Sequence, residues 1–157
     1  MKPEEFSFYG EELIVLLQEF SGKGASLRFQ ARGGSMTPFI RHGDIITITP
    51  LTCSLRTGDV VAFINPANNK LAVHRIIDTG KKFFIIKGDA FSRPDGVISE
   101  DNILGCVRKV ERNGKSISLG LGSERIIISW FSRLGILKPL VYLFRILIPS
   151  FIRRLIL

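Results

Sequence analysis

Short segments in which apolar and polar residues alternate fill the middle of the chain. Seven of them, rich in β-branched residues, are separated by clusters of Gly, Pro, Asn and Asp: ASLRFQA, DIITITP, DVVAFIN, LAVHRIID, KFFIIKG, NILGCVRKVE and SISLG. A period of two with such breaks is typical of antiparallel strands, and Asn113-Gly114 is typical of a two-residue hairpin turn. The pattern therefore predicts a mainly β domain over residues 26–122.

The two ends of the chain have a different pattern. Within an N-terminal segment of residues 1–25, the apolar positions of residues 3–21 recur at helical spacing among glutamates, and the glycine-rich SGKG follows. This predicts an acidic amphipathic helix. Residues 123–157 form a C-terminal segment that we expect to be a helical, basic and apolar tail, interrupted at Pro139 and Pro149.

Charge is distributed unevenly along the 157 residues. The net charge is +8, yet residues 1–124 hold 16 Lys and Arg against 14 Asp and Glu, whereas residues 125–157 hold six basic residues and no acidic one. A basic apolar segment suits an anionic membrane surface, while nucleic acid is usually bound by polar basic patches. We therefore expect membrane association through residues 123–157 and no nucleic-acid partner. The alternative is that this tail packs on the body or on a second copy.

Neither a spanning helix nor a signal peptide is expected. The longest apolar run near the N-terminus is LIVLL at residues 13–17, and a spanning helix needs about 20 apolar residues. The C-terminal tail would place a basic residue near the bilayer centre, which costs about 2.5–3.5 kcal/mol. The sequence does not indicate an oligomeric state.

Cysteine and histidine are scarce. The only cysteines are Cys53 and Cys106, and neither lies in a His- or Cys-rich stretch. We expect no disulfide framework, no metal and no cofactor, and the sequence leaves open whether the two cysteines pair.

A serine in a glycine-rich turn is the first candidate for chemistry. Ser35 stands in GGSMTP and could be turn punctuation or a nucleophile, which needs a base and a residue to orient that base. Of the two histidines, His42 lies in a polar turn and His74 in the strand-like LAVHRII. A hairpin across DTGKK would bring His74 close to the turn that holds Asp89 and, six residues on, Asp95. The alternative for both acids, which we favour for Asp95, is ordinary turn chemistry.

Four boxes in a fixed order carry a resemblance to a known family. GGSMTP, RTGDVVAF, LAVHRII and IKGDAFSRPD, within residues 30–108, resemble the signal peptidase I family of serine endopeptidases. They are similar in particular to the branch of archaea and the endoplasmic reticulum, in which histidine replaces a lysine base. The resemblance implies a coiled antiparallel β-sheet domain that cleaves signal or leader peptides from precursor proteins through an acyl-enzyme, without a cofactor.

The resemblance also implies roles for individual residues. Ser35 would be the nucleophile and His74 the general base, with Asp89 as the residue that orients the base and Asp95 as the second acid of the site. The remaining matched positions would shape the nucleophile loop and its oxyanion hole: Gly33, Gly34, Met36 and Pro38. The family usually has a hydroxyl residue where this chain has Gly33, so oxyanion stabilisation would rest on backbone N–H groups.

Two other functions remain open at this stage. Self-cleaving peptidases of the SOS-repressor type belong to the same superfamily and use a lysine base, for which Lys70 is the nearby candidate on the strand of His74. A non-catalytic, membrane-associated binding module with the same fold is the second alternative. For a signal peptidase the body would cross the membrane with its active site, whereas a leader peptidase would act on cytoplasmic precursors. A histidine base predicts that activity falls below a pH of about 6.5.

Overall fold

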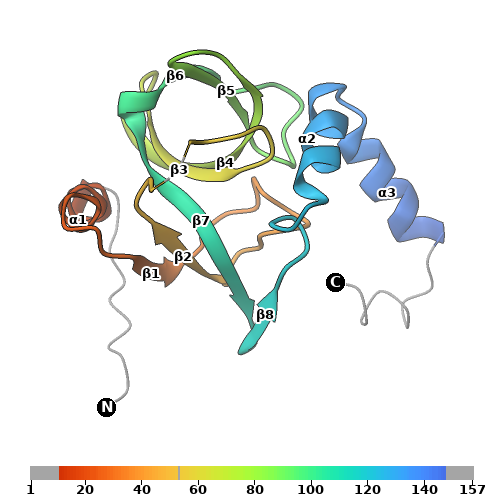
Figure 1. The fold of residues 1–157 in the computed structure, drawn as a ribbon. Coiled ribbons are helices and arrows are strands. Elements are labelled where there is room, and N and C mark those ends of the chain that lie inside the picture. Colours follow the sequence, from red (N-terminus) through yellow and green to blue (C-terminus); the bar gives the residue numbers. More distant parts are fainter. Residues whose placement is uncertain (1–10, 53, 148–157) are drawn as a thin grey trace.

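More of the described residues lie in strands than in helices (Figure 1). The computed structural model describes residues 11–52 and 54–147. The described helices are α1 (Glu11–Gly22), α2 (Arg125–Arg133) and α3 (Leu137–Leu147), with a short 3-10 turn, η1, at Glu100–Asn102. The described strands are β1 (Leu27–Gln30), β2 (Ile45–Thr49), β3 (Val60–Asn65), β4 (Lys70–Thr79), β5 (Phe83–Lys87), β6 (Gly96–Ser99), β7 (Ile103–Arg112) and β8 (Lys115–Ile117).

All described strands belong to one antiparallel sheet. Its order is β1-β2-β7-β3-β4-β5-β6, and β8 pairs with β7. Strands β3 to β6 curl round on themselves, while β7 runs from this curled part down to β2 and β8 (Figure 1). The mainly β, coiled antiparallel fold that the sequence predicts is confirmed.

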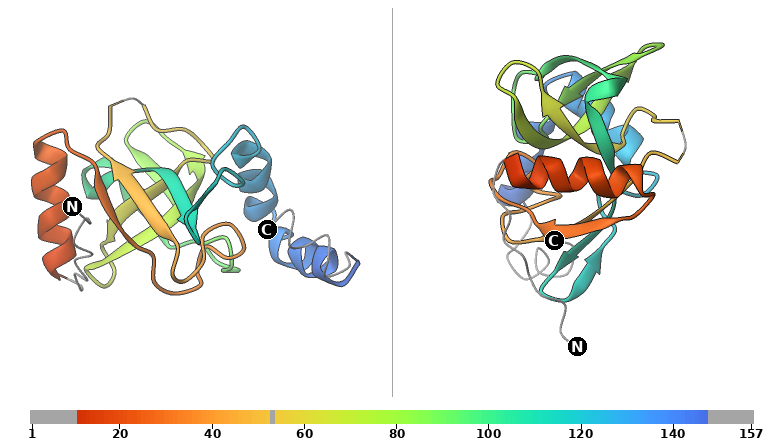
Figure 2. Two further views of the ribbon diagram at one scale, coloured as in Figure 1. Left: turned by 90° about the horizontal axis from the view of Figure 1, so that it is seen from below. Right: turned by 90° about the vertical axis from the view of Figure 1, so that its left-hand side faces the viewer.

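Two apolar clusters stabilise the two ends of the sheet. One lies in the curled part and includes Phe63, Ile76 and Ile86. The other contains residues of β2, β3 and β7 together with Leu17 of α1 and Met36 of the loop after β1. The helix α1 and the pair α2–α3 lie on opposite sides of the sheet (Figure 2). Both hydrophobic cores thus combine residues that are far apart in sequence, as burial of strand faces requires.

Several local predictions can be compared with the structure. Asn113 and Gly114 have φ angles of 50° and 76° and join β7 to β8 by the expected two-residue turn. An N-terminal helix was expected over residues 3–21, and α1 spans Glu11–Gly22; residues 3–10 lie outside the described residues. The short strand β6 was not expected, because GVIS follows a Pro-Asp turn and has only four residues.

The break in the C-terminal segment lies earlier than expected. Gly135, with a φ of 73°, separates α2 from α3, while Pro139 is the third residue of α3. Proline is tolerated in the first turn of a helix because its missing N–H would have no partner there, so Pro139 does not interrupt the helix. Pro149 lies outside the described residues.

One side of the C-terminal segment packs on the body. In α2, Ile128, Ser129 and Ser132 are buried, and Ile128 forms an apolar cluster with Phe39 and Leu137. Across residues 11–52 and 54–147, no helix is both long and apolar enough to cross a membrane. Cys106 is buried on β7, and the question of its pairing with Cys53 falls outside the described residues.

Candidate active site

Residues 31–44 form a closed loop between β1 and β2 that carries Ser35. At its base the N–H of Ala31 donates to the carbonyl of Asp44 at 2.7 Å, and Gly43 donates to Ala31 at 2.9 Å. Met36 is 3% exposed and packs in the core beneath the loop. Because Met36 is anchored while Ser35 is only half-buried, the loop presents the serine at the surface in a fixed position.

Gly33 has a backbone conformation that explains its identity. Its φ is 84°, in the left-handed region that glycine adopts without strain. A hydroxyl residue at this position, which the family resemblance would lead one to expect, would be strained although open space surrounds the site of its Cβ. The Gly33 N–H donates to Nδ1 of His42 at 3.4 Å, so the exposed His42 connects the two ends of this loop.

His74 lies on β4 with its ring in an aromatic cradle. The residue is 5% exposed, and its ring lies 5.9 Å from that of Phe63 and 5.5 Å from that of Phe91. Its Nδ1 is 2.7 Å from Oδ2 of Asp95. Because a carboxylate only accepts hydrogen bonds, Nδ1 carries the proton, and the neutral ring then has an unprotonated Nε2 that can accept one.

The serine loop and His74 meet at Gly88. A Cβ built on Gly88 would lie 2.9 Å from the carbonyl oxygen of Ser35 and 3.1 Å from Nε2 of His74. The N–H of Ala90 donates to the same Ser35 carbonyl at 2.8 Å. The turn after β5 therefore binds the backbone of the serine, and only a glycine at position 88 leaves room for this approach. The structure thus brings together Ser35, His74 and Asp95.

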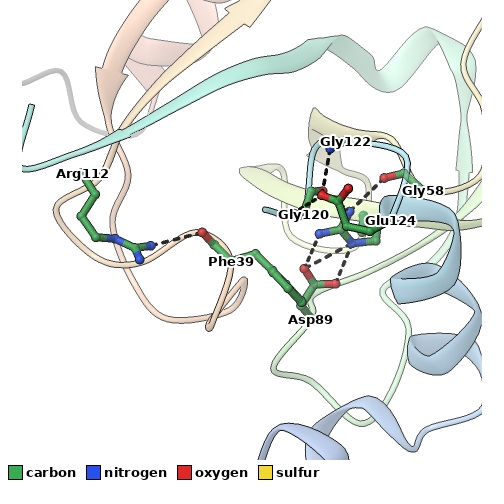
Figure 3. A network of polar contacts seen from close by, with 8 residues as sticks. Phe39, Gly58, Asp89, Arg112, Gly120, Gly122 and Glu124 are labelled. Carbon is green, nitrogen blue, oxygen red and sulfur yellow. Dashed lines mark hydrogen bonds and ion pairs between the residues drawn. The ribbon is translucent and has the colours of Figure 1, made fainter. Parts of the chain in front are cut away.

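Asp89 does not contact the histidine. It forms a fully buried ion pair with Arg75, whose Nε and Nη2 donate to the carboxylate at 2.9 and 2.7 Å. Arg75 also donates to the carbonyls of Gly58 and Gly120, at 2.9 and 2.7 Å (Figure 3). The expectation that Asp89 orients His74 is therefore wrong, and so is our preference for a turn role alone at Asp95, which makes that contact.

Strand alternation explains why the two acids differ. Neighbouring residues of a strand point to opposite faces, so His74 and Arg75 face different sides of β4. Asp95 lies on the side of His74, and Asp89 on that of Arg75. The guanidinium also lies over the ring of Phe39, at 5.4 Å. The ion pair of Arg75 and Asp89 thus holds the turn after β5, which contacts the backbone of Ser35, on the side away from His74.

Two further carboxylates brace the surroundings of the site. Asp44 accepts hydrogen bonds at 2.8 Å from Arg112 Nη2 and from the backbone of Arg41. Burial by itself would raise the pKa of Asp44, but these hydrogen bonds outweigh it and hold the pKa below its usual range. Arg112 also donates to the carbonyl of Phe39, at 3.2 Å (Figure 3). This contact ties the nucleophile loop to β7.

Glu124 stabilises the turn before α2, whose Gly120 carbonyl accepts a hydrogen bond from Arg75. Its carboxylate accepts from the N–H groups of Gly120 and Gly122 at 2.7 and 3.0 Å (Figure 3). Burial raises its pKa, yet hydrogen bonds from backbone N–H groups hold the pKa below the ordinary value. A negative charge on Glu124 therefore stabilises the turn before α2.

Two lysines are alternative candidates for the base of Ser35, and neither is suitably placed. Lys70 is exposed at the start of β4 and is four residues from His74, about 13 Å along a strand. Lys87 is buried, and its Nζ donates to the carbonyl of Ser132 in α2. It is paired with Arg75 across β4 and β5 and so shares that face. Burial lowers the pKa of Lys87, with the charge of Asp89 opposing.

The remaining sequence candidates serve the loop. Gly34 accepts the N–H of Thr37 at 3.1 Å in a tight turn, and Pro38 follows within the loop. Three residues of the surroundings were missed from the sequence: Arg75, Phe91 and Glu124. A charged residue in an otherwise apolar strand was the available signal for Arg75, whereas nothing local marks Phe91 or Glu124 as neighbours of the site. Within the described residues, no three His, Cys, Asp or Glu side chains come together to hold a metal.

The arrangement places the backbone of a half-buried serine and an imidazole bound to a carboxylate around the same glycine, Gly88. No curated protein sequence matches the chain significantly. A family model does match, over residues 3–108, and its description is Peptidase S24-like. This match supports the broader peptidase superfamily that the motif boxes indicate, although it does not select the histidine-base signal peptidase branch. Since the match covers more than half of the chain and includes every box, the protein belongs to the Peptidase S24-like family.

Proposed function

We propose that the protein is a serine endopeptidase that cleaves precursor proteins through Ser35 and His74. The observation that carries the proposal is the packing of both residues against Gly88, with His74 Nδ1 held 2.7 Å from Asp95. Ser35 Oγ attacks the peptide carbonyl while His74 Nε2 takes its proton, and the same proton then goes to the leaving amine. Water hydrolyses the resulting acyl-enzyme with His74 again as the base.

The substrates we propose are signal or leader segments of precursors. The support is the resemblance of the four motif boxes to the histidine-base signal peptidases, together with a histidine at the position of the base. Among the described strands, β1 lies at one edge of the sheet, and it leads directly into the nucleophile loop. An extended substrate can add main-chain hydrogen bonds along such an edge.

This proposal can be tested in two kinds of cells, one that makes the native chain and one that makes only the Ser35→Ala variant. The N-termini of the cellular proteins are then compared between the two. New N-termini directly after apolar export segments, lost in the variant, would support signal peptide cleavage. Loss of N-termini that follow short segments of cytoplasmic precursors would support a leader peptidase. Identical sets of N-termini would contradict the proposal and favour a non-catalytic binding module.

Self-cleavage is a second candidate, which membership in the Peptidase S24-like family favours. It would use the same serine but a bond of the same chain. Incubation of purified protein at two concentrations distinguishes the candidates, because cleavage within one molecule has a rate that does not depend on concentration. A native chain that shortens at such a rate, beside an intact Ser35→Ala chain, would establish self-cleavage. A native chain that stays intact would exclude it.

A further inference from the structure

The helix α2 presents its apolar side to solvent. Its buried positions include two serines, Ser129 and Ser132, each 0% exposed. By contrast, Trp130 is 63% exposed and Ile127 is 59% exposed. In a helix on the surface of a globular protein, serines usually face the solvent and large apolar residues face the core. In α2 these two serines and these two apolar residues have the reverse orientation, while Ile128 is buried.

Polar and ionic contacts hold α2 in this orientation. Lys87 of β5 donates to the carbonyl of Ser132 near the end of the helix, where a cation also interacts favourably with the helix dipole. Two ion pairs connect the helix to the sheet: Arg125 with Asp59 at 3.2 Å, and Arg133 with Asp78 at 3.1 Å. The body thus covers the side of α2 that carries both serines and Ile128, and it leaves Ile127 and Trp130 uncovered.

Exposed apolar residues occur in α2 and also in α3. At 3.6 residues per turn, the exposed apolar residues of α2 share one arc, opposite to Ile128 and Ser132. In α3, Leu140, Leu143 and Leu147 recur at spacings of three and four and are 45–69% exposed. We use the name α2–α3 face for seven exposed apolar residues of α2, α3 and the segment between them: Ile126, Ile127, Trp130, Leu134, Leu140, Leu143 and Leu147.

Charge identifies what covers this face. Beyond the two ion-paired arginines, residues 134–157 hold four basic residues, Lys138, Arg145, Arg153 and Arg154, and no acidic residue. A second copy would bring another segment with only basic charge against this one, and like charges repel. An anionic lipid surface offers both an apolar layer for the leucines and negative headgroups for the cations.

We propose that the α2–α3 face docks the protein on an anionic membrane surface, with the helices lying in the interface. The nucleophile loop would be held near that surface, since Phe39 packs with Ile128 and Leu137. The proposal goes beyond the peptidase function and does not rest on it, because the binding face shares no residue with Ser35, His74 and Asp95.

Trp130 makes a direct test available, because it is the only tryptophan of the chain. The full chain carrying Ser35→Ala is mixed with vesicles of phosphatidylcholine alone or with about one third phosphatidylglycerol. We expect a blue shift of Trp130 emission and quenching by brominated acyl chains with the anionic vesicles. We also expect binding at least about tenfold weaker with neutral vesicles or at 0.5 M salt. Unchanged emission, or equal binding to both vesicles, would overturn the proposal.

Matched variants show which surface binds. Ile127→Ser with Leu134→Ser changes two exposed residues of the α2–α3 face, and Phe83→Ser with Val97→Ser changes two exposed residues of β5 and β6. We expect about tenfold weaker vesicle binding for the first pair and none of this loss for the second, with equal thermal unfolding of both. A similar loss in both pairs would contradict the assignment. A blue shift without lipid that grows with protein concentration, with a doubled mass in sedimentation, would instead establish a second copy as the occupant.

Discussion

His74 and Arg75 are neighbours in the chain, but each binds a different aspartate. His74 Nδ1 lies 2.7 Å from Oδ2 of Asp95, and Arg75 Nη2 lies 2.7 Å from Oδ2 of Asp89. Because strand residues alternate between faces, one pair belongs to the candidate active site and the other to the packing behind it. This division predicts opposite consequences for two similar substitutions.

Asp95→Asn is expected to impair chemistry while leaving the fold intact. The amide does not hold His74 in the tautomer with a free Nε2 and does not stabilise the imidazolium. We expect the rate of covalent modification of Ser35 by a fluorophosphonate to fall by about 10²–10⁴-fold. The temperature of unfolding should stay within a few degrees of the native value, because asparagine has nearly the same size as aspartate and the Asp95 side chain is 12% exposed rather than fully buried. A modification rate equal to that of the native chain would contradict the role of Asp95.

Asp89→Asn is expected to impair stability first. The guanidinium of Arg75 is 0% exposed, and breaking a buried ion pair by removing one partner costs about 3–5 kcal/mol. Urea unfolding measures this loss. The control is Asp78→Asn, whose partner Arg133 has a side chain 56% exposed and whose loss should cost less than about 1 kcal/mol. Equal losses in the two variants would refute the structural role of the Arg75–Asp89 pair.

The ion pair of Asp44 and Arg112 should make stability depend on pH in the acid range. The pKa of Asp44 is lower in the folded chain than its ordinary value near 3.8. The carboxylate therefore contributes its full stabilisation above that ordinary value, and the contribution is lost as the pH falls through the lower folded-state pKa.

We expect Asp44→Asn to lose about 1–3 kcal/mol at pH 7, and its difference from the native chain to shrink below pH 4. Urea unfolding at a series of pH values measures the difference. Asp101→Asn, at an exposed position, should follow the native curve throughout. A difference that stayed constant down to pH 2.5 would show that the charge of Asp44 is not responsible.

The two glycines before Ser35 should respond differently to a methyl group. Gly33 has a φ of 84°, so Gly33→Ala is expected to cost about 1–2 kcal/mol of stability. A Cβ on Gly34 would meet only Thr37 Oγ1, at an ordinary 3.5 Å, so Gly34→Ala should cost less than about 0.5 kcal/mol. Thermal unfolding of the two variants measures this contrast. The reverse order of stability would be incompatible with the loop conformation described here.

The sequence is sufficient to predict features that depend on a local pattern of residues. It is not sufficient to predict features that depend on which side of a strand or helix a residue faces. Three local features are the motif around Ser35, the β4–β5 hairpin and the Asn113-Gly114 turn. The structure contains both the hairpin and the turn. The choice between Asp89 and Asp95 required the side of β4 to which each acid turns, and the loop that carries them has no periodicity from which this could be read. Similarly, composition indicates that the C-terminal segment is apolar and basic, but only packing shows that α2 buries its serines.

The most direct test of the central claim is the covalent modification of Ser35 by a fluorophosphonate, followed by peptide mass spectrometry. The native chain, His74→Ala and Lys70→Ala would be compared at pH 7.5 with equal reagent. We predict an adduct on Ser35 in the native chain and in Lys70→Ala at equal rates, and a rate at least about 100-fold lower in His74→Ala. A native chain without an adduct on Ser35, or a His74→Ala chain that reacts as fast as the native one, would contradict the account.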